Sequence, residues 1–424
     1  AREDQPLLQA AQLRIDGTRD ASDAADELPD PILRGGIANL PITGPVAFEF
    51  DRQLPTQIAV GIEQPIPNLA RRRARRGVAG ADVAVAQMRL GVAQQRIDIA
   101  TSAAWIDLYY AEEKLAFAHT ALSDLRRLQP VANSAVASGA ARPAESLAIR
   151  RELLVIEDAI TRIEAERDAA RAMLSSYIQT DDPTIAGNAP AADVDSGSLE
   201  QALDLNPVIR LADAATGRAE ANADLARADL RPDFGVSVNY GRRDPAFGDA
   251  FSVMGSVTLP IFTDQRQKPR IRAAEAEAAA TQAERDDRLR ALRVQFESDL
   301  ATWRSAKRQW ERARDELLPL ARQRVELETA SFAAGNADLI DVIAAKADLA
   351  LLDLEIFERE AATVEWAVGA FQEAGTISMT AVSGLPRLPD LGFFPTVETL
   401  AAQLVAFLAL GLGFRYGNRH HRSQ

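Results

Sequence analysis

The same pattern of residues occurs twice in this chain, and this duplication limits the fold more than any other feature of the sequence. Pairing Pro65 with Pro260, which stand in the similar segments 60–67 and 255–262, gives an offset of 195. Apolar residues at seven-residue spacing repeat at the same offset: Leu108, Leu115 and Leu122 correspond to Trp303, Trp310 and Leu317. Self-similarity at a fixed offset indicates one structural unit used twice.

Each copy predicts the same order of elements: a helix, a strand hairpin closed by proline, a very long helix, a glycine turn and a returning helix. Each long helix of about 70 residues would reach roughly 105 Å, and Asn68 and Asp264 are the predicted N-caps. In the first copy, 1–178, we expect strands at about 32–40 and 57–64, a long helix at about 68–138 and a return helix at about 143–178. In the second copy, 207–375, we expect strands at about 234–241 and 251–259, a long helix at about 264–334 and a return helix at about 338–372. Residues 179–206 are a predicted linker, and the tail 376–424 has no predicted structure.

The hairpins have the length and the alternation of membrane-spanning strands. Apolar residues alternate with polar or small ones, which marks strands with one apolar and one polar face. Runs of this length fit the roughly 9–11 residues that a tilted strand needs to cross a bilayer. The predicted lipid-facing residues are Ile58, Val60, Ile62, Val236, Val238, Val253 and Val257.

Four predicted strands are too few to stand alone in a membrane. Lipid cannot satisfy the hydrogen-bonding groups of an open sheet edge, so a membrane sheet must close into a barrel. The smallest barrels have about eight strands, so closure needs at least two chains, and three chains would give twelve strands. Two other interpretations stay open: a soluble β-layer packed on helices, and a periplasmic coiled-coil adaptor or scaffold without a barrel.

The composition excludes several classes of protein. A net charge of −13 argues against a nucleic-acid binder. The absence of cysteine removes thiolate metal sites, disulfides, thiol nucleophiles and a lipidated N-terminal cysteine from this sequence. The histidines, His119, His420 and His421, belong to no catalytic motif. We therefore expect no enzyme activity, no cofactor and no metal site. The apolar run 400–414 contains Gln403 and is shorter than the roughly 20 residues of a transmembrane helix.

The duplicated order of elements resembles the TolC-type outer-membrane efflux channels over roughly residues 6–375. Within it, the stretches 28–31, 39–41 and 61–67 and the arginine run at 71–76 look most like the cobalt–zinc–cadmium resistance branch. The resemblance implies a mainly α fold with a membrane β-hairpin layer, in which three copies form a twelve-stranded β-barrel in the outer membrane and a twelve-helix α-barrel across the periplasm.

The resemblance also implies partners and cargo. It implies a homotrimer that works in a tripartite, proton-driven efflux system with a periplasmic adaptor (membrane fusion) protein and an inner-membrane pump of the resistance-nodulation-division type. The implied cargo is divalent heavy-metal cations, with drugs or secreted proteins as the alternative.

The glycine turns between the paired helices are the predicted periplasmic tips. A glycine at such a place ends a helix in a left-handed cap, and in the resembled family these turns contact the adaptor. The predicted adaptor-contact residues are Ser138, Gly139, Ala140, Ala334, Gly335 and Asn336.

Acidic residues open the returning helices, and Glu145, Asp338 and Asp341 are the predicted entrance residues. Acids in a first turn stabilise the helix dipole, but three copies of Asp341 around a narrow aperture would also favour cations. The resembled family carries two acids one turn apart at this tip, whereas here Ala344 holds the second place. Ion binding at the entrance is therefore not predicted.

Basic residues open both long helices. Such a run is either a solvated face or a contact with phospholipid head groups where the chain leaves the membrane. The first run consists of Arg71, Arg72, Arg73, Arg75 and Arg76, and the second of Arg266, Lys268, Arg270 and Arg272.

Overall fold

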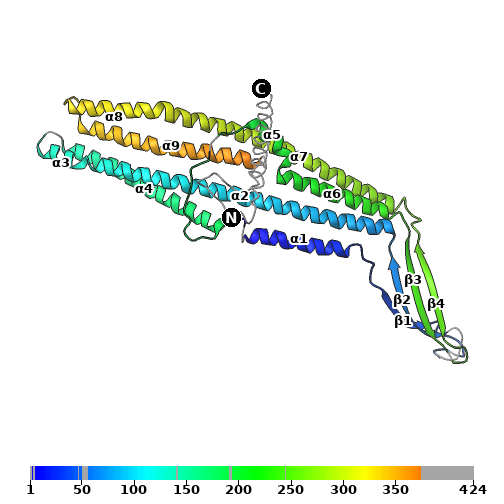
Figure 1. The fold of residues 1–424 in the computed structure, drawn as a ribbon. Helices are drawn as coiled ribbons and strands as arrows, with labels where there is room; N and C mark the ends of the chain where they lie inside the picture. Colours follow the sequence, from blue (N-terminus) through cyan, green and yellow to red (C-terminus); the bar gives the residue numbers. More distant parts are fainter. Residues whose placement is uncertain are drawn as a thin grey trace, which may run out of the picture. The chain divides into compact units, whose positions relative to one another are not determined.

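A computed structural model describes residues 2, 5–45, 47–49, 56–139, 142–190, 193–243 and 245–373. These residues are mainly helical, with long helices and one four-stranded antiparallel sheet (Figure 1). The first half contains α1 (Pro6–Ala24), β1 (Ile32–Ala38), β2 (Gln57–Ile66), α2 (Leu69–Arg126), α3 (Gln129–Ala137) and α4 (Pro143–Ile178). The second half contains α5 (Ser196–Ala202), a short 3-10 turn η1 (Leu203–Leu205), α6 (Pro207–Ala228), β3 (Asp233–Arg242), β4 (Ala250–Thr258), α7 (Gln267–Arg312), a π-turn η2 (Ala313–Leu317), α8 (Leu318–Ala333) and α9 (Leu339–Glu373).

The prediction of one unbroken helix at 68–138 is wrong. The chain breaks between α2 and α3, where Pro130 stands in the first turn of α3. Proline has no backbone N–H, and its ring clashes with the carbonyl four residues earlier. In the second copy Pro319 is accommodated differently, because the π-turn η2 widens the helix and the N–H of Leu318 donates to the carbonyl of Ala313.

The predicted N-cap is confirmed in one copy and wrong in the other. The side chain of Asn68 accepts a hydrogen bond from the N–H of Arg71, as an N-cap does. Helix α7 instead begins three residues after Asp264, and Arg266 at its N-cap makes no side-chain cap. Asp264 pairs with Lys268 at 2.5 Å, which holds the carboxylate outside the helix start.

The helices nearest the sheet follow the order of the strands. The strands are ordered β1-β2-β3-β4, and α1 lies beside α2, α2 beside α6, and α6 beside α7 (Figure 1). Along the chain α1 leads into β1, β2 into α2, α6 into β3, and β4 into α7. Each strand is therefore connected directly to the helix at the same position in the helical layer. The sheet and this layer of helices end at the same two sides, with β1 and α1 on one side and β4 and α7 on the other.

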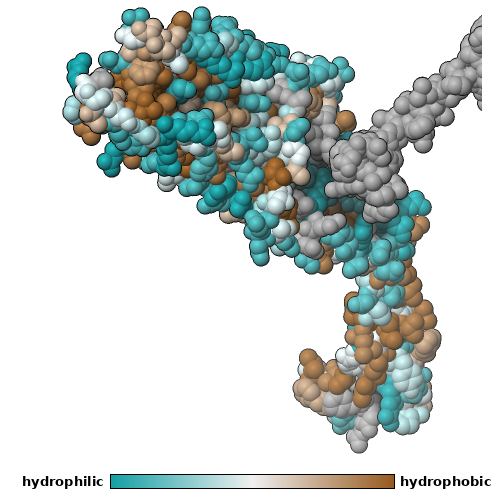
Figure 2. Space-filling view, turned by 60° about the vertical axis from the view of Figure 1, so that its left-hand side comes forward, coloured by the Kyte–Doolittle hydropathy of each residue, from teal (hydrophilic) through white to brown (hydrophobic). Residues whose placement is uncertain are grey.

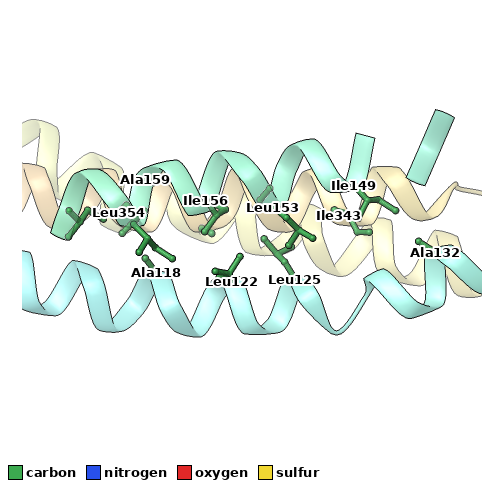
Figure 3. Close-up of a cluster of buried hydrophobic side chains, with 14 of the residues drawn as sticks. Ala118, Leu122, Leu125, Ala132, Ile149, Leu153, Ile156, Ala159, Ile343 and Leu354 are labelled. Atoms are coloured by element: carbon green, nitrogen blue, oxygen red, sulfur yellow. The ribbon is translucent and has the colours of Figure 1, made fainter. Parts of the chain in front are cut away.

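Towards the glycine turns, several helices share one apolar core. Side chains from α2, α4 and α9 meet at three- and four-residue spacing, and Ala132 of α3 joins them (Figure 3). This spacing is the pattern of side-by-side helix packing. Ile156 is fully buried, and Ile163 and Ile343 are each 1% exposed. Helix α8 packs on α9 beyond this core.

A polar clasp joins the start of α2 to the turn between α6 and β3. Asn68 is only 7% exposed, and its backbone N–H and side-chain amide donate to Asp233 at 2.9 and 2.8 Å. The same amide reaches the carbonyls of Ala228 and Arg231. Arg71 pairs with Asp233 and, at 2.6 Å, with Asp229. These bonds hold the two central strands on their helices, where the chain changes from extended to helical backbone.

Replacing Asn68 with alanine should destabilise the fold by about 2–3 kcal/mol, because it removes an N-cap and leaves buried acceptors without their donor. Asn68→Ser, which keeps the capping oxygen, should lose less. The measurement is the midpoint of urea unfolding followed by the helical circular dichroism signal. Equal losses in the two variants would show that the capping hydrogen bond to the N–H of Arg71 contributes nothing.

Candidate functional site

One face of the sheet is apolar from edge to edge. The strand register aligns Ile62 with Val238, and Val238 with Val253, and residues opposite each other in an antiparallel pair share a face. All seven predicted lipid-facing residues lie on this apolar face, together with Leu33, Ile37, Phe234, Tyr240 and Phe251. Within the single chain the seven predicted residues are exposed, from 39% for Val238 to 61% for Val253. Figure 2 shows the apolar side chains gathered over this part of the molecule.

The opposite face of the sheet is mostly polar or small, with Ile32 and Met254 as apolar exceptions. It carries Glu63, Ser237, Asn239, Ser252 and Ser256, and Arg34 pairs with Glu63 across it at 2.5 Å. Gly61 lies under the side chain of Asn239, so closely that a Cβ at this position would stand 2.0 Å from the amide oxygen. This polar face therefore depends on glycine to let long side chains cross between strands.

The two tips are left-handed glycine caps. Gly139 has a φ of 72° and Gly335 a φ of 74°, values that glycine adopts without steric cost. At the second tip the N–H of Asn336 donates to the carbonyl of Ser331, and the N–H of Gly335 to that of Phe332, which is the Schellman motif. Ser138, Gly139, Ala334, Gly335 and Asn336 are all exposed, and Ala140 lies outside the described residues.

The predicted entrance acids occupy equivalent places in the two copies. Glu145 accepts a hydrogen bond from the N–H of Arg142 at 3.2 Å, and Asp341 accepts one from the N–H of Asp338 at 3.3 Å. Each acid thus reaches back to the start of its returning helix, as in a capping box. Asp338 and Asp341 are exposed, and Glu145 is half-buried. The fold therefore gives both acids a local structural role at the helix start.

The first basic run divides into two groups. Arg71 belongs to the clasp, and Arg72 and Arg76 both pair with Asp26, just after the end of α1. Arg73 and Arg75 are exposed and make no ion pair within the described part of the chain. The sequence alone could not distinguish the paired arginines from the unpaired ones, because the acids that pair with them lie about 50 and 160 residues away along the chain.

The described residues contain no constellation that supports catalysis. They hold no group of three or more His, Cys, Asp or Glu side chains that could bind a metal ion, and His119 is exposed on α2. The buried Lys114 pairs with Glu166 at 2.6 Å and stands 4.0 Å from Glu358, which ties α2 to α4 and α9. Burial raises the pKa of the Glu360 carboxyl. The Tyr110 hydroxyl and, to a smaller extent, the charge of Arg314 act in the opposite direction and lower this pKa. These groups lie among packed helices.

Among the helices that the structure describes, none has the length and apolar character of a membrane span. The apolar run 400–414, His420 and His421 lie in the tail outside the described residues.

Comparisons with known proteins agree with this geometry. Residues 198–366 match the family model described as outer membrane efflux protein. The comparison with curated proteins found no match. A solved membrane protein from Pseudomonas aeruginosa is similar at 16% identity, 88% coverage of each chain and a TM-score of 0.74. CusC, described with its transmembrane channel formation, is similar at 15% identity over 87% of this chain and 88% of its own, with a TM-score of 0.70. The open MtrE outer membrane channel of Neisseria gonorrhoeae is similar at 17% identity over 88% of this chain and 87% of its own, with a TM-score of 0.69.

At these identities the solved structures show the fold, and the family model adds the sequence signature of the second copy. The channels of this family are not enzymes, and they lie in the outer membrane with a helical extension into the periplasm. The similarity to CusC does not show that this chain belongs to the heavy-metal branch, because an identity of 15% does not identify the transported substrate. Residues 198–366 therefore carry the sequence signature of the outer membrane efflux proteins, and the described chain has the fold of solved outer-membrane channels.

Proposed function

We propose that three copies of this chain close into a twelve-stranded barrel and a twelve-helix tunnel that passively exports cargo across the outer membrane. The observation that carries the proposal is the sheet, which has one apolar face, one polar face and two open edges within the described chain, at β1 and β4. An apolar outer face suits lipid and a polar inner face suits a watery lumen. The open edges favour closure against further copies, because lipid offers no hydrogen bonds.

The helices support the same closure. Helices α1 and α7 end the layer next to the sheet, as β1 and β4 end the sheet. Towards the tips the outer helices α4 and α8 expose leucines seven residues apart, which is the spacing of a coiled-coil seam. These leucines are 51% to 67% exposed: Leu147, Leu154, Leu320 and Leu327. We propose that α4 of one copy packs against α8 of the next through them. The division into repeats at 1–178 and 207–375, with a linker at 179–206, accords with this scheme.

The tips and the membrane-proximal arginines are proposed contact sites. Ser138, Gly139 and Ala140 in one copy, and Ala334, Gly335 and Asn336 in the other, would meet a periplasmic adaptor that links the channel to an inner-membrane pump of the resistance-nodulation-division type. TolC-family channels are typically trimers in such tripartite pumps. Of the first basic run, the exposed Arg73 and Arg75 are available to lipid head groups.

The cargo proposal rests on sequence motifs alone. The stretches 28–31, 39–41 and 61–67 favour divalent heavy-metal cations, with drugs or secreted proteins as the alternatives. Glu145, Asp338 and Asp341 from each copy would make the entrance acidic, which suits cations.

The first test is assembly. The protein extracted in detergent should be a trimer by cross-linking and by light scattering corrected for detergent. A compact monomer in aqueous buffer without detergent would contradict the barrel and favour the soluble or adaptor interpretation.

Replacing Val238 with arginine should cost about 2–4 kcal/mol of membrane assembly if this residue faces lipid near the middle of the bilayer. Ser252→Arg is the matched control, because Ser252 lies at the same level of the sheet on the polar face. The measurement is urea-dependent folding into lipid vesicles. If Ser252→Arg is the more damaging change, the two faces are assigned the wrong way round.

Replacing Leu147 and Leu154 together with glutamate should lower the trimer fraction, because it puts charge into the proposed seam between copies. The methionine pair at the same two positions keeps the apolar surface and should assemble normally. Cross-linking in detergent measures both. Full trimer yield in the glutamate pair would show that α4 does not contact a second copy there.

Asp341→Asn should reduce the cation preference of single channels in planar bilayers, because three like charges at the aperture are removed. Asparagine can still accept the hydrogen bond from Asp338, so folding and trimer formation should be unchanged. Glu326→Gln, an exposed change on α8, is the control. If selectivity is unchanged and thermal stability falls, Asp341 only stabilises the helix start.

A further inference from the structure

A groove runs between α1 and α2 and reaches Arg218 on α6. Its volume is about 890 Å³, which is within the range of small-molecule sites in proteins. The floor consists of small apolar side chains. Ala11, Val85 and Ala86 are each only 7% exposed, so the floor is closed by packing between the two helices. Such a surface accepts a flat apolar body.

The walls of this groove carry an excess of positive charge. Arg14, Arg89 and Arg96 line it and are exposed. None of the three makes an ion pair or a side-chain hydrogen bond within the described residues. The one acid in the lining, Asp82, pairs with Arg218 at 2.5 Å, and the opposite charges of these two residues therefore cancel. Three uncompensated arginines therefore remain in a chain whose net charge is −13.

This charge pattern is built into α2. Asp82, Arg89 and Arg96 are seven residues apart and so lie along one face of the helix. Helix α1 adds Arg14 from the other side of the groove. By contrast, three of the five arginines at the start of the same helix, Arg71, Arg72 and Arg76, pair with acids. The groove thus lacks the acidic partners that this chain supplies nearby.

We propose that this groove binds an anionic amphiphile, a molecule with a flat apolar body and one sulfonate, carboxylate or phosphate group. The body would lie over Val85 and Ala86, and the anion would accept hydrogen bonds from the guanidinium groups of Arg89, Arg96 and Arg14. Guanidinium presents paired donors that match such oxyanions. The groove lies within one copy, so the site needs neither the proposed trimer nor the proposed cargo.

The test uses the full chain reconstituted in lipid nanodiscs and two probes of the same shape. Titration calorimetry should show binding of naphthalene-1-sulfonate and not of the cation 1-naphthylmethylammonium. Affinity should fall as salt is raised, because exposed charges are screened. The double variant Arg89→Gln with Arg96→Gln should bind the sulfonate about tenfold or more weakly, since it loses charged hydrogen bonds. Arg308→Gln, an exposed change on α7, should bind as the unchanged chain does.

Three results would overturn this inference. Equal binding of the two probes would show that the apolar floor acts without the arginines. Equal loss in the double variant and in Arg308→Gln would mean that overall charge is responsible. Absence of sulfonate binding, together with loss of the trimer in the double variant, would show that acids of a second copy occupy the groove. Cross-linking of the same samples reports assembly, so failure of the channel proposal is seen separately.

Discussion

The structure depends on backbone hydrogen bonds that a membrane does not supply. A four-stranded sheet with one apolar face leaves the N–H and C=O groups of β1 and β4 open along two edges. Water would satisfy them, but lipid does not. The apolar face and the open edges therefore point together to closure against further copies. Because each strand continues the helix of the same place, the proposed closure of the sheet would also close the helical layer.

The junction between sheet and helices has to hold this register. The central junctions are short, because β2 ends at Ile66 and α2 begins at Leu69, and α6 ends at Ala228 and β3 begins at Asp233. The backbone groups freed there need partners. Asn68 supplies a cap for α2 and, with Arg71, ties it to the α6–β3 turn through Asp229 and Asp233. No equivalent cap exists at the start of α7, where Asp264 pairs with Lys268. The clasp thus fixes the two central strands on their helices.

Charge serves different purposes along the chain. Near the sheet it joins elements, as Arg72 and Arg76 do with Asp26. At the tips Glu145 and Asp341 close the first turns of the returning helices. Between α1 and α2 three arginines have no acid beside them. That difference, more than the number of charges, separates the proposed ligand groove from the surfaces that only stabilise the fold.

The sequence by itself determined the order of elements, the faces of the strands and the place of the tips. Alternation at period two and apolar spacing at seven are local patterns, and a glycine that ends a helix acts locally as well, so Val238, Leu122 and Gly335 could be assigned from their neighbours. The sequence did not distinguish the effects of two prolines: Pro130 breaks the first long helix, whereas Pro319 is accommodated by a π-turn in the second. Only the tertiary structure decided which arginines are paired, because Asp26, Asp229 and Asp233 approach from distant segments. It also brought α1 beside α2 and so placed Arg14 and Arg89 in the same groove, which no spacing along the chain indicates.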